Sequence, residues 1–264
     1  MRPAPPGGIH QRQAPRMPGT SFRLISMSGD SVTLFIRWSL PHWVALGIVA
    51  AAAGALLWGC RRLGMEKRVL VGKVLGAVFL LTFLVETFGR IVREHWEPWQ
   101  DRLPLHFCSL MTLACFIALW YRRPWACAAA YFGVLAASIQ GLITPMLYEG
   151  FPSGAFFAFF VGHGLLLVSA LYIPVVLQWR ARPWDDVKTL ALCDAYLLLI
   201  IPVNIWLGTN YGFTRHAPPG TVLEYFGPAP WYFLTLQVPA LIVLRLLYLT
   251  VRPGKKQECS GEDA

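Results

Sequence analysis

The sequence predicts an all-α, polytopic membrane protein with a bundle of about seven transmembrane helices, and three observations support this fold class. Of the 264 residues, 56% are hydrophobic and only 14% are charged, whereas a soluble globular domain carries about a quarter charged residues. The apolar residues form seven stretches, each long enough to cross about 30 Å of hydrocarbon at about 1.5 Å per residue. These stretches are apolar around most of their circumference, as lipid-embedded helices are.

The predicted helices follow one another with short polar connections. They cover residues 41–60, 69–89, 103–121, 124–147, 154–178, 187–207 and 230–251. Residues 38–252 therefore form one transmembrane domain. Residues 1–37 are rich in Pro, Gly and Arg without an apolar signal-peptide core, and we expect a disordered tail there. Residues 253–264 form a second, cytoplasmic tail.

The distribution of Lys and Arg predicts the orientation, because positive loops resist translocation across the membrane. The short connections hold twelve of these residues on one side and four on the other. The N-terminus is therefore predicted to lie outside and the C-terminus in the cytoplasm, in a cell inner membrane. Five arginines in the N-terminal tail narrow the difference to twelve against nine.

Charge and cysteine usage exclude several function classes. The net charge of +9 comes from short basic clusters between apolar runs, without the basic stripe or motif of a nucleic-acid-binding protein. The six cysteines contain no CxxC pair, which argues against a disulfide framework or a structural zinc site. No HxxxH or HxxEH spacing is present, so we expect neither a metal nor another cofactor.

Polar residues gather in the outer half of the predicted bundle, close to the ends of several helices. A charge at mid-depth in a membrane costs about 2.5 to 3.5 kcal/mol, so such residues are normally paired or functional. We therefore expect one polar site near the outer leaflet. Its candidate residues are His42, Glu86, His106, Cys108, Gln140, Thr144, His163, Asn210 and Tyr211.

His163 is the deepest ionisable residue of this group, about nine residues or 14 Å into the fifth helix. The flanking Gly162 and Gly164 allow a neighbouring helix or a substrate to approach closely. Three interpretations stay open for this side chain. It is a neutral histidine bonded to a partner helix, a general acid or base, or a metal ligand.

His106 and Cys108 lie in the predicted first turns of the third helix. Two residues rotate a regular helix by about 200°, so at most one of the pair would face His163. The thiol of Cys108 is either a small packing group or a nucleophile. Glu86 either pairs with Arg90 four residues later or orients a histidine.

Five short motifs together resemble a known family. They are LPLHFCS at 103–109, LITP at 142–145, GHG at 162–164, GTNYGF at 208–213 and GPAPWY at 227–232. Their order and spacing resemble the bacterial YwaF-like integral membrane proteins over residues 35–251. That group is distantly similar to eukaryotic transmembrane protein 164, an acyltransferase that moves fatty acyl chains onto ether phospholipids.

The resemblance implies a seven-helix enzyme that acts on lipid acyl chains. His106 and His163 match the histidines of the eukaryotic pattern, whereas Leu105 occupies the position of its proposed cysteine nucleophile. Cys108 is offset from that position by three residues, about 60° around a helix. The chain therefore keeps the histidines and departs at the nucleophile.

Two function hypotheses follow. In the first, the protein is a lipid acyltransferase or lipid hydrolase. His163 acts as the general base, Cys108 or a lipid or water hydroxyl is the nucleophile, and His106 and Asn210 polarise the acyl carbonyl. The remaining candidates would contact the substrate: Tyr211, Gln140, Thr144, Glu86 and His42. In the second, a non-enzymatic carrier or sensor binds a small amphiphile in the same cavity. The partner is a membrane lipid or a small amphiphile in either case.

Overall fold

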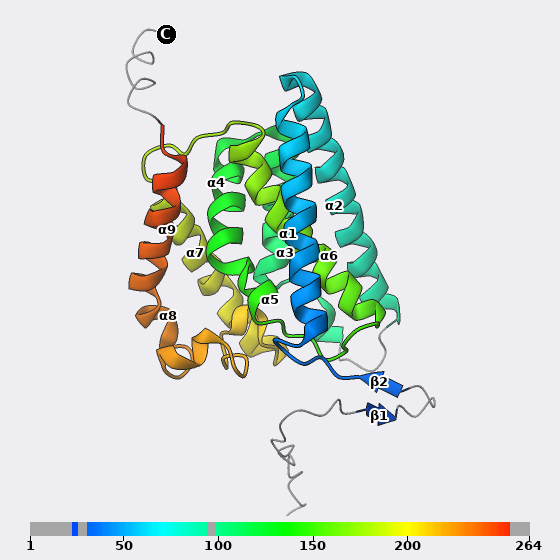
Figure 1. Ribbon diagram of the computed structural model, residues 1–264. Helices are drawn as coiled ribbons and strands as arrows, with labels where there is room; N and C mark the ends of the chain where they lie inside the picture. Colours follow the sequence, from blue (N-terminus) through cyan, green and yellow to red (C-terminus); the bar gives the residue numbers. More distant parts are fainter. Residues whose placement is uncertain (1–22, 26–30, 94–98, 254–264) are drawn as a thin grey trace, which may run out of the picture.

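The computed structural model describes residues 23–25, 31–93 and 99–253. Seven helices in these ranges are long and apolar enough to cross a membrane, which confirms the all-α polytopic fold (Figure 1). The spans are Leu40–Arg61, Met65–Gly89, Trp99–Tyr121, Pro124–Ile143, Gly154–Val175, Asp185–Leu207 and Tyr232–Val251.

Some spans are built from more than one helical element. The α-helices are α1 (Leu40–Arg61), α2 (Met65–Arg93), α3 (Phe107–Tyr121), α4 (Pro124–Gly133), α5 (Gln140–Ile143), α6 (Gly154–Val175), α7 (Asp185–Leu207), α8 (Tyr232–Thr235) and α9 (Gln237–Val251). Short 3-10 helices are η1 (Trp99–Arg102), η3 (Tyr211–Phe213) and η4 (Val222–Phe226), and η2 (Val134–Ser138) is a π-helix.

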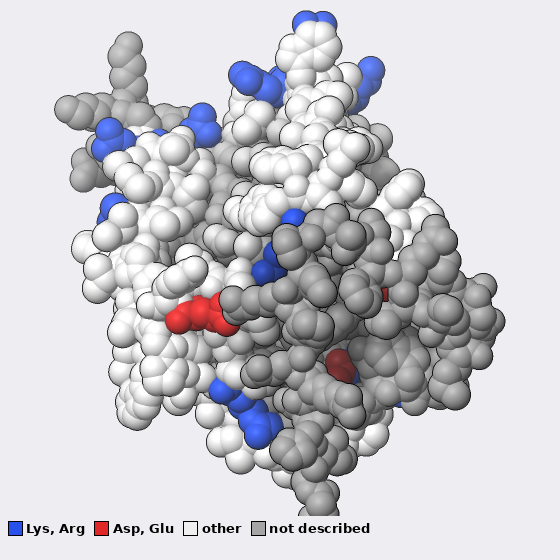
Figure 2. Space-filling view, turned by 60° about the horizontal axis from the view of Figure 1, so that its bottom comes forward, with Lys and Arg blue, Asp and Glu red and all other residues white. Residues whose placement is uncertain are grey.

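The core of the bundle lies where α3, α4 and α6 meet. Small side chains allow close approach of these helices, and the sequence of α4 supplies them as a run from Ala126 to Ala130 that is almost completely buried. Tyr172 of α6 fills the space beside them. By contrast, α7 and α9 form an edge of the bundle, and few of their side chains are buried. Figure 2 shows that the surface along α1 and α2 is largely uncharged, with Lys and Arg gathered near the α1–α2 turn.

The predicted fourth span, residues 124–147, is interrupted and ends early. Between α4 and α5 the π-helix η2 inserts one residue, so that the Ile139 N–H donates to the Val134 carbonyl at 2.8 Å. Helix α5 then ends at Ile143 instead of Leu147. The reason for the early end is Pro145, because a proline disfavours helical geometry in the residue before it.

Two further predicted helices differ at their starts. Helix α3 begins at Phe107 and not at residue 103, and His106 is its N-cap in an extended conformation. The last span is divided at Leu236 into α8 and α9. Pro239 explains this division, since it lacks the N–H that would bond the carbonyl of Thr235.

The end of the predicted N-terminal tail pairs with the bundle. Strands β1 (Arg23–Ile25) and β2 (Ser31–Thr33) are antiparallel. The Phe35 N–H donates to the Tyr148 carbonyl at 2.8 Å, which attaches this segment to the α5–α6 connection. Residues 1–22, 26–30 and 254–264, the rest of both predicted tails, lie outside the described residues.

Candidate functional site

All the predicted site residues lie in one half of the bundle. Helices α1, α3 and α6 begin at this end and α2 and α7 finish there, whereas α9 ends at the opposite end (Figure 1). We call it the site end. The predicted site residues, which are far apart in sequence, therefore lie toward the same end of the helices. Which side of the membrane this end faces stays a prediction.

The ring of His163 is fixed by contacts on two sides. Its Nδ1 donates to the Phe159 carbonyl one turn earlier, at 3.1 Å, and the ring stacks on Phe159 with centroids 4.2 Å apart. A carbonyl can only accept, so Nδ1 carries the proton in the neutral ring and Nε2 carries the lone pair. Among the described residues, Nε2 has no hydrogen-bond partner. In the neutral ring, Nε2 is thus the nitrogen that is available to accept a proton.

The available Nε2 faces the break between η2 and α5. A Cβ at Gly141 would lie 2.5 Å from both Nε2 and Cδ2 of His163, so only glycine leaves room for the ring there. Gly141 was not among the residues predicted to form the site. A glycine next to a polar residue in a predicted helix could have indicated this role. The π-helix beside it, however, could not be predicted from the sequence.

Cys108 approaches the same break from α3. Its thiol lies beside the hydroxyl of Ser138, the last residue of η2. That hydroxyl is buried and makes no hydrogen bond within the described residues. Ser138 and Gly141 are three residues apart, about one helical turn. The segment formed by η2 and α5 therefore lies beside the Cys108 thiol at one turn and beside the His163 imidazole at the next.

His106 lies on the other flank of this region, against the loop that follows α7. Its ring packs edge-on against Tyr211, with centroids 4.8 Å apart, and near Phe213 at 6.1 Å. The Tyr196 hydroxyl donates to the Leu105 carbonyl at 2.8 Å, which fixes the backbone just before His106. Because His106 is an N-cap and not a residue within the helix, the 200° argument for a regular turn does not apply to this pair.

The loop that carries Tyr211 is organised by Asn204. This fully buried side chain accepts from the Tyr211 N–H at 2.9 Å and from the Thr209 hydroxyl at 2.7 Å. Its Nδ2 donates to the Tyr211 carbonyl at 2.7 Å and to the Thr214 hydroxyl at 2.6 Å. All its hydrogen-bonding capacity toward the loop is used, so Asn204 positions Tyr211 and is not itself available to a ligand.

Asn210, predicted to polarise a carbonyl, is engaged within the same loop. Its Nδ2 lies 2.8 Å from Nδ1 of His216 and donates to the His216 carbonyl at 3.0 Å. Its Oδ1 accepts from the Arg215 N–H at 2.9 Å. The loop is partly exposed, and in this conformation the amide closes the turn.

His42 is completely buried where α1 begins. Nδ1 accepts from the Trp38 N–H at 3.0 Å, and Nε2 donates to the Leu142 carbonyl at 2.9 Å. Both ring nitrogens are therefore occupied by backbone groups. The contact joins α1 to the end of α5, one residue from Gly141.

The remaining predicted site residues also lie at the site end. Glu86 of α2 faces α6, since its Oε1 would lie 3.9 Å from a Cβ at Gly162; the predicted partner Arg90 has its side chain outside the described residues. Gln140 is exposed, and the Thr144 hydroxyl donates to its carbonyl at 3.2 Å. In the described ranges, no group of three His, Cys, Asp or Glu side chains is placed to hold a metal ion.

An apolar groove of about 530 Å³ opens between α1 and α6 in the same half of the bundle. Its walls include Val44, Ile48 and Val49 of α1 and Phe157, Phe160 and Gly164 of α6. Gly164 allows Val49 to approach closely, because a Cβ there would lie 3.2 Å from a Val49 methyl. A groove of this composition suits hydrocarbon, and no pattern in the sequence predicted it.

One comparison with known proteins identifies a family for this chain. The model of the TMEM164 family matches residues 37–248, from the start of the first span to the end of the last. No curated protein and no solved structure matches the chain. Because the match covers most of the chain and includes both histidines and the loop after α7, the protein belongs to the TMEM164 family.

Proposed function

We propose that this membrane protein is a lipid acyltransferase or lipid hydrolase, with His163 as its general base. The orientation of the His163 ring carries the proposal. Its Nδ1–H is held by the Phe159 carbonyl, which leaves the Nε2 lone pair directed at the helix break. A base needs this arrangement, in which one nitrogen is anchored and the other is open to a proton.

In the proposed reaction, Nε2 removes a proton from the nucleophile as it attacks the ester carbonyl of an acyl lipid. The carbonyl becomes a tetrahedral oxyanion. When the intermediate collapses, the C–O bond to the lysolipid breaks and the leaving oxygen takes the proton from His163. The acyl chain ends on the nucleophile, and no redox partner or metal is required.

Two nucleophiles fit this scheme. The Cys108 thiol, beside Ser138, would form a thioester that an acceptor lipid or water then attacks. Alternatively, the hydroxyl of an acceptor lipid or of water attacks directly. Substitution of Cys108 separates these routes, because only the first requires a sulfur atom.

Groups beside Cys108 suit the developing oxyanion. The N–H groups of Phe107 and Cys108, the first two residues of α3, have no partner within the helix, and His106 is the N-cap residue without a side-chain hydrogen bond to this turn. Donors directed at an oxyanion typically contribute a large part of acyl-transfer catalysis. We assign His106 to this role and Tyr211 to holding its ring. The neighbouring α1–α6 groove supplies an apolar surface for a lipid chain.

The test uses the purified full chain in detergent with a phospholipid labelled in one acyl chain. We expect release or transfer of the label, and a loss of at least about 100-fold in His163→Gln. Thermal unfolding and gel filtration show whether the variant stays folded. Binding of the lipid without turnover in the wild type would contradict the enzyme and support the carrier or sensor hypothesis.

A pair of cysteine variants tests which group is the nucleophile. Cys108→Ser is compared with Cys193→Ser, since Cys193 is a half-buried free cysteine of α7 that is not among the candidate site residues. If Cys108 forms a thioester, its variant loses activity by about 100-fold or more while the control is unchanged. Equal activities would assign the attack to a lipid or water hydroxyl.

We also propose that the site end faces the outside of a cell inner membrane, on the basis of the twelve against four Lys and Arg in the short connections. A single cysteine introduced at Ser153, in the α5–α6 connection, tests this in a background without the native cysteines. A membrane-impermeant thiol reagent should label it in intact cells. Labelling only after the cells are opened would reverse the orientation.

A further inference from the structure

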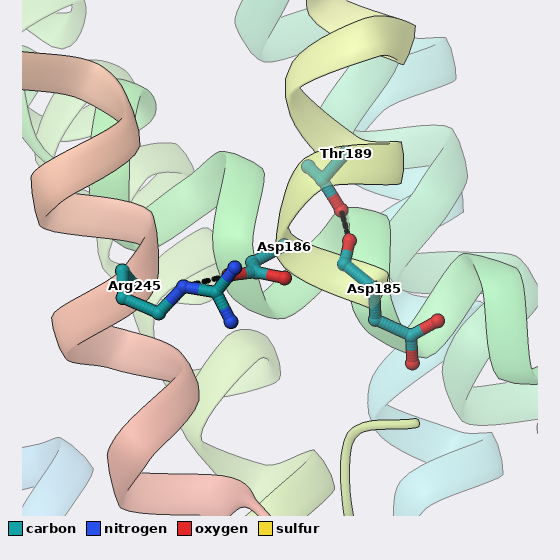
Figure 3. A network of polar contacts seen from close by, with 4 residues as sticks. All are labelled: Asp185, Asp186, Thr189 and Arg245. Carbon is teal, nitrogen blue, oxygen red and sulfur yellow. Dashed lines mark hydrogen bonds and ion pairs between the residues drawn. The ribbon is translucent and has the colours of Figure 1, made fainter. Parts of the chain in front are cut away.

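A second group of polar side chains lies at the other end of the bundle, where α7 meets α9. Asp186 belongs to the first turn of α7 and is completely buried. Arg245 of α9 reaches across to it, with Nε 3.1 Å from Oδ2 (Figure 3). Asp185 points to the other side of α7 and accepts from the Arg182 N–H at 2.8 Å. The pair links two helices at the edge of the bundle.

The ion pair uses only one edge of the guanidinium. A buried ion pair is normally closed off from its surroundings, yet the Arg245 side chain is 44% exposed. Neither terminal nitrogen has a hydrogen-bond partner within the described residues. These nitrogens form a rigid fork of donors that matches the oxygens of a phosphate.

Aromatic rings flank the exposed part of Arg245. Its guanidinium carbon lies 5.9 Å from the centroid of Trp184 and 5.4 Å from that of Tyr248. Trp184 is itself 64% exposed, and exposed tryptophans are enriched at the level of lipid headgroups. The rings limit the orientations of the guanidinium without satisfying its donors.

The position of the group identifies what can reach it. Arg245 lies six residues before the end of α9, about 9 Å along the helix axis. The connection before α7 lies at the end of α9, because the Ala181 N–H bonds the Val251 carbonyl at 3.0 Å. The fork therefore faces the lipid boundary at an interfacial depth, where lipid headgroups supply phosphate anions.

We propose that Arg245, held by Asp186, binds the phosphate group of a membrane phospholipid at the end of the bundle opposite to the site end. The buried carboxylate fixes one edge of the guanidinium and the opposite edge bonds two phosphate oxygens. Trp184 and Tyr248 flank the headgroup. This site lies apart from the residues proposed for acyl transfer and does not depend on that activity.

The test measures lipid retention by native mass spectrometry of the delipidated full chain in detergent. The probes are dioleoyl phosphatidylglycerol, dioleoylglycerol with the same chains and no phosphate, and inorganic phosphate. We expect one phosphatidylglycerol to bind saturably and dioleoylglycerol to bind at least tenfold more weakly. Competition by millimolar inorganic phosphate would identify free phosphate as the ligand, whereas its failure to compete would identify the lipid headgroup.

The variants separate this role from a structural one. Arg245→Gln should weaken phosphatidylglycerol binding at least tenfold. The matched control is Arg62→Gln, since Arg62 also lies over an aromatic ring, Trp58 at 3.5 Å, but has no buried acid beside it; its effect should stay within twofold. Asp186→Asn keeps an oxygen that accepts from Nε of Arg245, and so still holds the guanidinium, but removes the competing negative charge; it should leave binding equal or tighter.

Three results would overturn the proposal. They are unchanged binding in Arg245→Gln, equal binding of the lipid without phosphate, or a loss in Asp186→Asn as large as that in Arg245→Gln. If Arg245→Gln unfolds because it leaves Asp186 unpaired, the double variant Asp186→Asn with Arg245→Gln removes both charges and gives the same measurement.

Discussion

His42 and His163 lie at the same end of the bundle and differ in how their ring nitrogens are used. His42 is completely buried, and backbone groups of Trp38 and Leu142 occupy both of its nitrogens. His163 has one nitrogen bonded to Phe159 and the other directed at the helix break. The first ring holds two helices together, and the second keeps a lone pair available for chemistry.

The same contrast separates the two asparagines near the end of α7. Asn204 is buried with every contact made inside the loop it supports, while Asn210 is partly exposed at the loop surface. A buried polar group pays for any lost partner with its full desolvation cost, whereas water replaces a partner at an exposed one. A polar side chain that is buried and has all its hydrogen-bonding groups paired within the protein therefore has a structural role.

The largest expected effect is the loss of stability when Asn204, which organises the loop after α7, is replaced. Asn204→Leu leaves the N–H and carbonyl of Tyr211 and the hydroxyls of Thr209 and Thr214 without this partner, and should lower the free energy of unfolding by about 3 to 5 kcal/mol. Asn210→Leu should cost below about 1 kcal/mol, because water reaches its partners. Chemical denaturation in detergent measures both, and equal costs would remove the distinction.

A smaller effect sharpens the contrast between the histidines. His42→Phe keeps the volume but leaves the Trp38 N–H and the Leu142 carbonyl unpaired, which should cost about 2 to 3 kcal/mol. His163→Gln, which loses one bond within its own helix and is no larger than the ring packed against Gly141, should cost below about 1 kcal/mol while it abolishes turnover. A larger loss of stability at His163 than at His42 would reverse the assignment of the two roles.

The smallest expected effect concerns the space beside His163. Gly141→Ala places a methyl group 2.5 Å from the Nε2 position and forces the ring to move, so activity should fall about tenfold, equivalent to about 1.4 kcal/mol. Gly162→Ala is the matched control, because its nearest neighbour, Oε1 of Glu86, lies at an ordinary 3.9 Å. Activity of the two variants is compared in the same lipid assay. Equal activities would show that the break does not position the ring.

The length and composition of the apolar stretches determined the seven spans, since crossing a bilayer fixes the length of a helix and requires its backbone to be bonded internally. The alternation of helix direction then placed His42, His106, Cys108 and His163 at one end. The boundaries were less certain: the prolines at 145 and 239 explain a helix end and a division, but the π-helix η2 between α4 and α5 left no legible pattern.

Only the tertiary structure decided which of these residues has all its hydrogen-bonding atoms paired and which keeps one available. The partner of His42 at Leu142 is 100 residues away, and Arg245 meets Asp186 across two helices. Such contacts depend on how helices pack, and packing follows the shapes of side chains far apart in the chain. The local sequence therefore determined how deep in the bundle each polar group lies, and the packing of the helices determined its hydrogen-bond or ion-pair partner.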